Sequence, residues 1–206
     1  MRMKALFWYR ISMQKFSIVS ILIICIIINF ISIQYFDSFS MLFFIVIFSL
    51  NIVNSFYEQD KKANWELFVN SLPLAKKTQL KTDFLFCYCQ ILLLFIITAP
   101  FYFMHITIYS NFSEHFALYF ANISCVILLI CIQFYILHVQ DTKSMKNLRL
   151  FTAVFLIFLI NYPIHYYLSL VAGNLLVILV PTIISTMISI FVFRKCLALL
   201  AAKEIF

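Results

Sequence analysis

The stretch from Tyr57 to Asp83 reads YEQDKKANWELFVNSLPLAKKTQLKTD, and it is the longest polar reach of the chain. The sequence on either side of it is almost uninterruptedly apolar. Of the 206 residues, 65% are hydrophobic and only 11% are charged, whereas soluble domains carry about 25% charged residues. We therefore expect an integral membrane protein in which this stretch faces the cytosol.

Six segments without Lys or Arg are long enough to cross a hydrocarbon core of about 30 Å, for which about 20 helical residues suffice. They predict an all-α protein with one transmembrane domain over residues 1–206. Residues 1–15 mix aromatic and basic side chains, which favours a short helix lying in the membrane interface. The predicted spans are Phe16 to Phe36, Ser38 to Phe56, Phe84 to Tyr109, His115 to Gln140, Leu150 to Leu168, and Gly173 to Phe193.

The basic residues indicate the orientation of these spans. Every Lys and Arg lies within residues 2–15, 61–81, 143–149 or 194–203, and six spans place all four segments on one side. The connections near residues 37, 111–114 and 169–174 contain no basic residue. By the positive-inside rule both termini are cytoplasmic, in a multi-pass protein of the plasma membrane. Basic helix ends held against anionic lipid then explain the net charge of +7 without nucleic-acid binding.

The cytosolic loop, residues 57–83, has its own helix signals. Asp60 is suited to cap the start of a helix that contains Trp65 and Phe68. Pro73 is suited to the first turn of a following helix, because its missing N–H costs nothing there. We expect this second helix to contain the lysines at 76, 77 and 81 and to run on into span three. We therefore expect span two to end at Phe56 and a short cytoplasmic helix to lie between spans two and three.

Two segments together resemble the ABC-2 family of ABC-transporter permeases. These are MKALFWYRI at Met3 to Ile11 and the central stretch extended to Phe84. The resemblance extends to a compact bacterial branch that includes the membrane subunits of staphylococcal exporters for phenol-soluble modulins, which are small amphipathic toxins. In that branch an acidic residue, a Trp and a Leu-Pro followed by basic residues mark the segment after span two.

This resemblance implies two partners, a cytosolic ATP-binding-cassette ATPase and a second permease subunit. It also implies that the cytosolic loop includes a coupling helix docked on the ATPase. The alternative is that Trp65 anchors at the membrane interface and the lysines are ordinary cytoplasmic charges. The residues that match the motif or neighbour it are Glu58, Asp60, Trp65, Glu66, Phe68, Leu72, Pro73, Lys76 and Lys77.

Polar residues inside the spans are candidates for a translocation path. Asn122, Gln133 and Gln140 fall within a narrow stripe of one helix, at about 3.6 residues per turn, so this face should point away from lipid. Such a stripe either hydrogen-bonds neighbouring helices or lines the path. The candidate path residues are Gln90, His105, Asn122, Gln133, Asn161 and His165.

Pro163 lies between Asn161 and His165 and interrupts span five. One interpretation is a re-entrant segment, which the family resemblance implies for the region between spans five and six. The other is an ordinary helix bent at Pro163.

Several features that the sequence lacks argue against particular classes of function. The chain has a single glycine, whereas a phosphate-binding P-loop needs several, so we expect no ATP site and no enzyme activity in this subunit. The six cysteines lie in apolar spans or at a span end, which favours core positions over a metal site. We expect no cofactor. No acidic residue is expected deep in a span, which argues against coupling to an ion gradient.

These features predict a permease subunit of an ABC exporter that moves an amphipathic peptide or a lipophilic compound out of the cell. Two alternatives stay open. One is a non-transporting immunity or sensor protein for a membrane-active peptide. The other is the membrane substrate-binding subunit of an uptake system.

Overall fold

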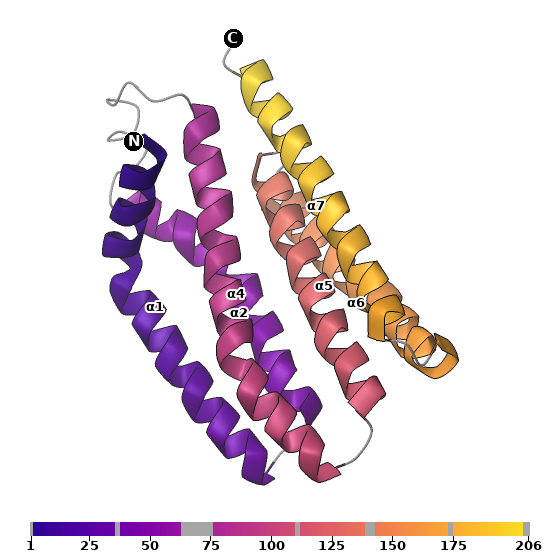
Figure 1. Cartoon of the computed structure of the whole chain (residues 1–206). Coiled ribbons are helices and arrows are strands. Elements are labelled where there is room, and N and C mark those ends of the chain that lie inside the picture. Colours follow the sequence, from indigo (N-terminus) through magenta and orange to yellow (C-terminus); the bar gives the residue numbers. More distant parts are fainter. Residues whose placement is uncertain are drawn as a thin grey trace.

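The structure is a computed structural model, and it describes residues 2–35, 38–62, 76–109, 112–138, 143–172 and 175–203. Each of these ranges forms a single helix, so the described chain is entirely helical, as predicted (Figure 1). The helices are α1 (Arg2–Tyr35), α2 (Ser38–Lys62), α4 (Lys76–Tyr109), α5 (Phe112–His138), α6 (Lys143–Ala172) and α7 (Leu175–Lys203).

The helices form a bundle with α5 at its centre. Among the described residues α5 contacts α2, α4, α6 and α7, whereas α1 contacts only α2 and α4 and α6 contacts only α5 and α7. Figure 1 shows both ends of the chain at the same end of the bundle. This arrangement fits an even number of membrane crossings.

Five of the helices are long and apolar enough to cross a membrane. These five segments are Met3–Ile31, Lys77–Met104, Phe112–Leu137, Ser144–Val171 and Leu176–Leu199. The protein is therefore a multi-pass membrane protein. The helix α2 is not among the five, so its crossing, and with it the count of six spans, stays a prediction.

Burial separates the central helix from the outer ones. Within the most apolar stretch of each helix, 67% of α5 is buried inside the bundle, against 11% of α1 and 17% of α7. Lipid is as apolar as these side chains, so close packing rather than exclusion from water must hold the helices together. Ala117, Ala121 and Cys125 supply that packing, because these small residues follow one another at every fourth position of α5 and are fully buried.

Two sequence predictions differ from the observed helices, and one open alternative is decided. The helix α2 does not end at Phe56 but continues to Lys62, so Asp60 lies inside it and does not cap a new helix. Residues 1–15 were expected to form a separate helix, but α1 runs without a break from Arg2 to Tyr35. The helix α6 contains Pro163 and continues to Ala172, as the interpretation of an ordinary helix predicts.

Candidate coupling site

A buried cluster of three charged side chains joins three helices at the end of the bundle where the N-terminus lies. Arg10 comes from α1, Asp60 from α2 and Asp83 from α4, and their residues are 1%, 6% and 3% exposed. The Arg10 Nη2 atom donates to Asp60 Oδ2 at 2.8 Å, and Nε donates to Asp83 Oδ1 at 3.1 Å. The Arg10 Nη1 atom also donates to Asp60 Oδ1, which makes that pair bidentate. We call these three residues the Arg10 cluster.

The geometry of arginine explains why it occupies this position. A guanidinium presents its N–H groups in a fixed planar fork that matches carboxylate oxygens, and it stays charged even when buried. Burying charges is costly unless they are paired and hydrogen-bonded, so each member of the cluster needs the others. The position of α1 is thereby fixed relative to both α2 and α4.

The cluster lies beside the segment that the sequence predicts to be the coupling loop. Asp60 is close to the last described residue of α2, Lys62, and Asp83 lies in the first part of α4, which begins at Lys76. Residues 63–75 connect these two helix ends along the chain. The Arg10 cluster therefore ties α1 to the two helices that flank residues 63–75.

Two further polar contacts lie along the same pair of helices, α1 and α4. Gln90 Nε2 donates to Gln14 Oε1 at 3.3 Å, one turn of α1 beyond Arg10. Farther along, Asn29 Nδ2 donates to Thr98 Oγ1 at 3.2 Å. Arg10, Gln14 and Asn29 of α1 thus each form a hydrogen bond with α4.

The predicted path residues Asn122, Asn161 and His165 make polar contacts within and between α5, α6 and α7. Tyr162 Oη donates to Asn122 Oδ1 at 2.6 Å and so joins α6 to α5. His165 Nε2 lies 3.4 Å from both Ser124 Oγ on α5 and Thr182 Oγ1 on α7. The other ring nitrogen, Nδ1, lies 2.9 Å from the Asn161 carbonyl oxygen.

The remaining described path candidates contact other helices. Gln133 Nε2 donates to the Leu50 carbonyl oxygen of α2 at 3.4 Å, and Gln90 bonds to α1 as described above. Asn122 and Gln133 are 0% and 2% exposed, which confirms that their stripe points away from lipid. The sequence thus predicted which face of α5 is buried. The hydrogen bonds of Gln133 and Gln90, however, join different pairs of helices.

Some predicted site residues lie outside the described residues. This is so for Trp65, Glu66, Phe68, Leu72, Pro73 and Gln140, and for the side chains of Lys76 and His105. Glu58 and Lys77 are exposed. Asp60 is buried and bonded to Arg10, so its carboxylate contacts the protein's own first helix.

Arg10 and Asp83 were not among the predicted site residues. The sequence interpretation treated Arg10 as one more basic residue at a membrane surface and Asp83 as a residue of the cytosolic side. A usable signal was present, because Arg10 and the polar residue Gln14 are one turn apart and so share a helix face. Among the described residues, no three His, Cys, Asp or Glu side chains are grouped to hold a metal ion.

Comparison with known families agrees with this membrane architecture. Residues 4–194 match the family model described as ABC-2 family transporter protein. No curated protein and no solved structure matches the chain. Because the family match covers nearly the whole sequence and spans all the helices just described, the protein belongs to the ABC-2 family of transporters.

Proposed function

We propose that this protein is the permease subunit of an ABC exporter. A separate cytosolic ATPase supplies the energy, and a second permease subunit completes the transport path. The substrate class is an amphipathic peptide or a lipophilic compound, as the resemblance to the phenol-soluble modulin branch implies. The observation that carries the proposal is the Arg10 cluster, because it connects α1 to both helices that flank the predicted coupling loop.

The proposed coupling begins when ATP binding closes the ATPase subunits and displaces the loop around Trp65. The displacement passes to α2 through Asp60 and to α4 through Asp83. Since Arg10 is bonded to both carboxylates, α1 moves with these helices rather than sliding past them. The three helices then change position against the second subunit and open the path outward.

A combined substitution in the loop tests the docking residues. Trp65→Ala with Lys76→Ala and Lys77→Ala removes a large aromatic contact and two charges that the family resemblance assigns to ATPase docking. We expect normal membrane insertion, loss of co-purification with the ATPase, and loss of substrate-stimulated ATP hydrolysis. Arg194→Ala with Lys195→Ala is the matched control, because these exposed basic residues lie about two turns before the end of α7, away from the loop.

The outcome separates the three function classes. Export and ATPase binding at wild-type levels in the loop variant would overturn the assignment of these residues to docking. If the wild-type protein neither binds an ATPase nor alters its activity, yet protects cells against a membrane-active peptide, it is an immunity protein. If a substrate instead accumulates on the side of the proteoliposome membrane that corresponds to the cytosol, the protein is an uptake subunit.

A further inference from the structure

An apolar groove of about 420 Å³ lies between α1 and α4, with α2 at one side. It is lined by side chains from all three helices, and only Gln90 and Cys89 carry polar groups. The lining residues are Phe7, Ile11, Ile18, Ile21, Leu22, Ile52, Phe86, Cys89, Gln90, Leu93 and Leu94. The volume lies within the range of roughly 300–1,000 Å³ that is typical of small-molecule sites.

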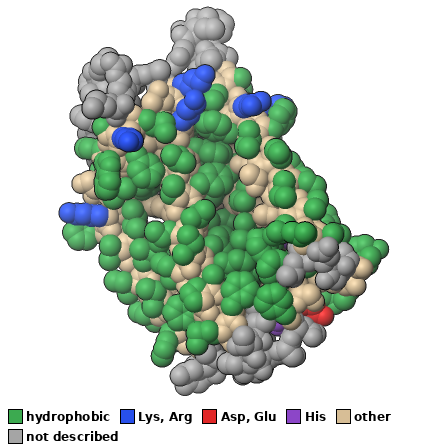
Figure 2. Space-filling view, viewed as in Figure 1, with side chains coloured by type: hydrophobic (Ala, Val, Ile, Leu, Met, Phe, Trp, Pro, Cys, Tyr) green, Lys and Arg blue, Asp and Glu red, His purple; other side chains and the backbone are tan. Residues whose placement is uncertain are grey.

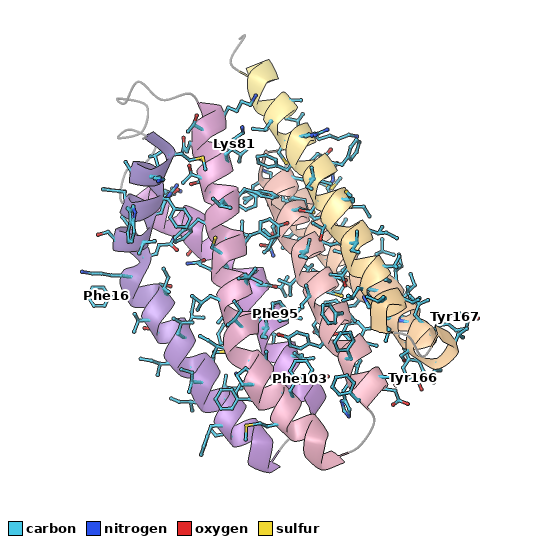
Figure 3. All side chains as sticks on the ribbon, in the orientation of Figure 1. Phe16, Lys81, Phe95, Phe103, Tyr166 and Tyr167 are labelled. Atoms are coloured by element: carbon cyan, nitrogen blue, oxygen red, sulfur yellow. The ribbon has the colours of Figure 1, made fainter. Side chains whose placement is uncertain are left out.

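The groove opens on the surface of the protein that faces lipid. Cys89 and Leu93 are both lining residues and exposed residues. The neighbouring surface of α1 is apolar and strongly exposed, and Phe16, labelled in Figure 3, points outward from it with 78% of its surface accessible. In the space-filling view α1 and α4 present mainly hydrophobic side chains (Figure 2). The molecules that reach this groove most readily are therefore those of the surrounding bilayer.

The long axis of the groove follows α1. At about 1.5 Å per residue, the lining residues Phe7 and Leu22 lie about 22 Å apart along the helix. Phe7 packs against Phe86 of α4, with ring centres 5.7 Å apart, and Phe86 lies just inside the third predicted span. This end of the groove therefore lies near one membrane surface, and Ile18 and Leu22 lie deeper among the acyl chains. The groove thus runs from near the headgroups into the chains of one leaflet.

A lysine lies at the edge of the groove. Lys15 does not line the groove itself, but it lies one turn after the lining residue Ile11 and one turn before Ile18. Its side chain is exposed, and its Nζ atom lies 5.2 Å from the centre of the Phe16 ring. The long side chain of a lysine in a membrane helix extends toward the headgroups, where its ammonium group attracts anionic lipid.

The volume decides between an alkyl chain and a helical peptide. A helix is about 10–12 Å across and rises about 5.4 Å per turn, so a single turn would fill about 420 Å³ or more. A single extended alkyl chain can instead follow the groove over its length. We propose that the groove binds one anionic phospholipid, with an acyl chain between α1 and α4 and the phosphate beside Lys15.

Cys89 provides a direct measurement of occupancy. It is exposed in the groove, whereas the other five cysteines are buried. With the purified protein in detergent, we expect phosphatidylglycerol to slow alkylation of Cys89 by N-ethylmaleimide severalfold and phosphatidylcholine to slow it less. Leu92→Cys in a Cys89→Ser background is the control, because Leu92 is 61% exposed on the same helix but does not line the groove.

Two pairs of variants test the groove and the headgroup contact separately. Lys15→Gln should abolish the preference for phosphatidylglycerol, whereas Lys195→Gln should keep it. Lys195 is a fair match, because its Nζ atom lies 5.1 Å from the centre of the Phe191 ring, in a helix that does not line the groove. By native mass spectrometry, a retained phospholipid should be lost in Leu93→Trp, which fills the groove, and kept in Leu92→Trp.

Two results would overturn the proposal. In the first, neither lipid protects Cys89, or both protect the Leu92→Cys control equally well. In the second, Leu93→Trp retains as much phospholipid as Leu92→Trp. Neither experiment involves an ATPase or a transported substrate, so its outcome is independent of the proposed export function.

Discussion

The Arg10 side chain lies between two carboxylates and is bonded to both of them in a part of the bundle that is closed to solvent. Removing one partner of a buried ion pair is more damaging than replacing the whole group with apolar residues, because the remaining charge is left uncompensated. Removal of Arg10 alone can be compared experimentally with replacement of the whole cluster by apolar residues. The comparison also distinguishes a cluster that stabilises the fold from one that serves coupling.

Arg10→Met should destabilise the protein by about 3–5 kcal/mol, because Asp60 and Asp83 then lose their buried cation. Arg10→Met with Asp60→Leu and Asp83→Leu should recover most of this loss but not export. The measurement is thermal or denaturant unfolding in detergent, followed by transport assays of the stable variant. Lys4→Met is the control, since Lys4 is exposed on the same helix. If Arg10→Met is as stable as the wild type, the cluster does not hold the helices together.

For single residues, the sequence predicted which side chains are buried better than it predicted which residues they bond to. The spacing of Asn122 and Gln133 correctly placed both on a buried face, because helical periodicity is a local property. The cap predicted for Asp60 was wrong, because its partner Arg10 lies 50 positions earlier in the chain. A local pattern of capping residues carries no information about such a contact.

Among the helices, α5 depends most on close packing. Four other helices contact it, and its small, fully buried residues Ala117, Ala121 and Cys125 allow close packing. In a chain with one glycine, these residues supply the small contact surface that glycines provide in many membrane helices.

Ala121→Leu should therefore destabilise the bundle by about 1–3 kcal/mol, because a fully buried position cannot take a larger side chain without displacing its neighbours. Ala5→Leu makes the same change at an exposed position of α1 and should have little effect. The melting temperatures of the two purified variants provide the comparison. Equal melting temperatures would show that α5 is not closely packed at Ala121.

The sequence predicted the existence of all the described helices but not their lengths. The absence of Lys and Arg marks only the part of a helix that lies in hydrocarbon, whereas the backbone bonds continue beyond it. The helix α2, for example, was expected to end at Phe56 and continues to Lys62. Its additional turns contain Asp60, and this is one reason why the Arg10 cluster was not predicted.

For the whole molecule, the order of packing could not be predicted from composition. The apolar segments of α1 and α5 have the same mean hydropathy, so this property does not mark α5 as central and α1 as peripheral. The groove between α1 and α4 likewise arises from the placement of three helices. The even number of crossings, in contrast, was predicted from charge alone and is consistent with both chain ends lying at one end of the bundle (Figure 1).

The positive-inside rule also predicts which end of the bundle faces the cytosol. The helices α4 and α5 run in opposite directions, so Lys77 and Ser113 lie at opposite ends of the bundle (Figure 1). In a Cys89→Ser background, a membrane-impermeant maleimide should label Ser113→Cys on intact cells. It should label Met3→Cys and Lys77→Cys only after the cells are permeabilised, because the positive-inside rule places these positions in the cytosol. Because α1 is long and apolar enough to cross the membrane, equal sidedness of positions 3 and 77 then requires that α2 crosses it as well. Labelling of Lys77→Cys from outside, with Met3→Cys protected, would mean that α2 does not cross and that the six-span arrangement is wrong.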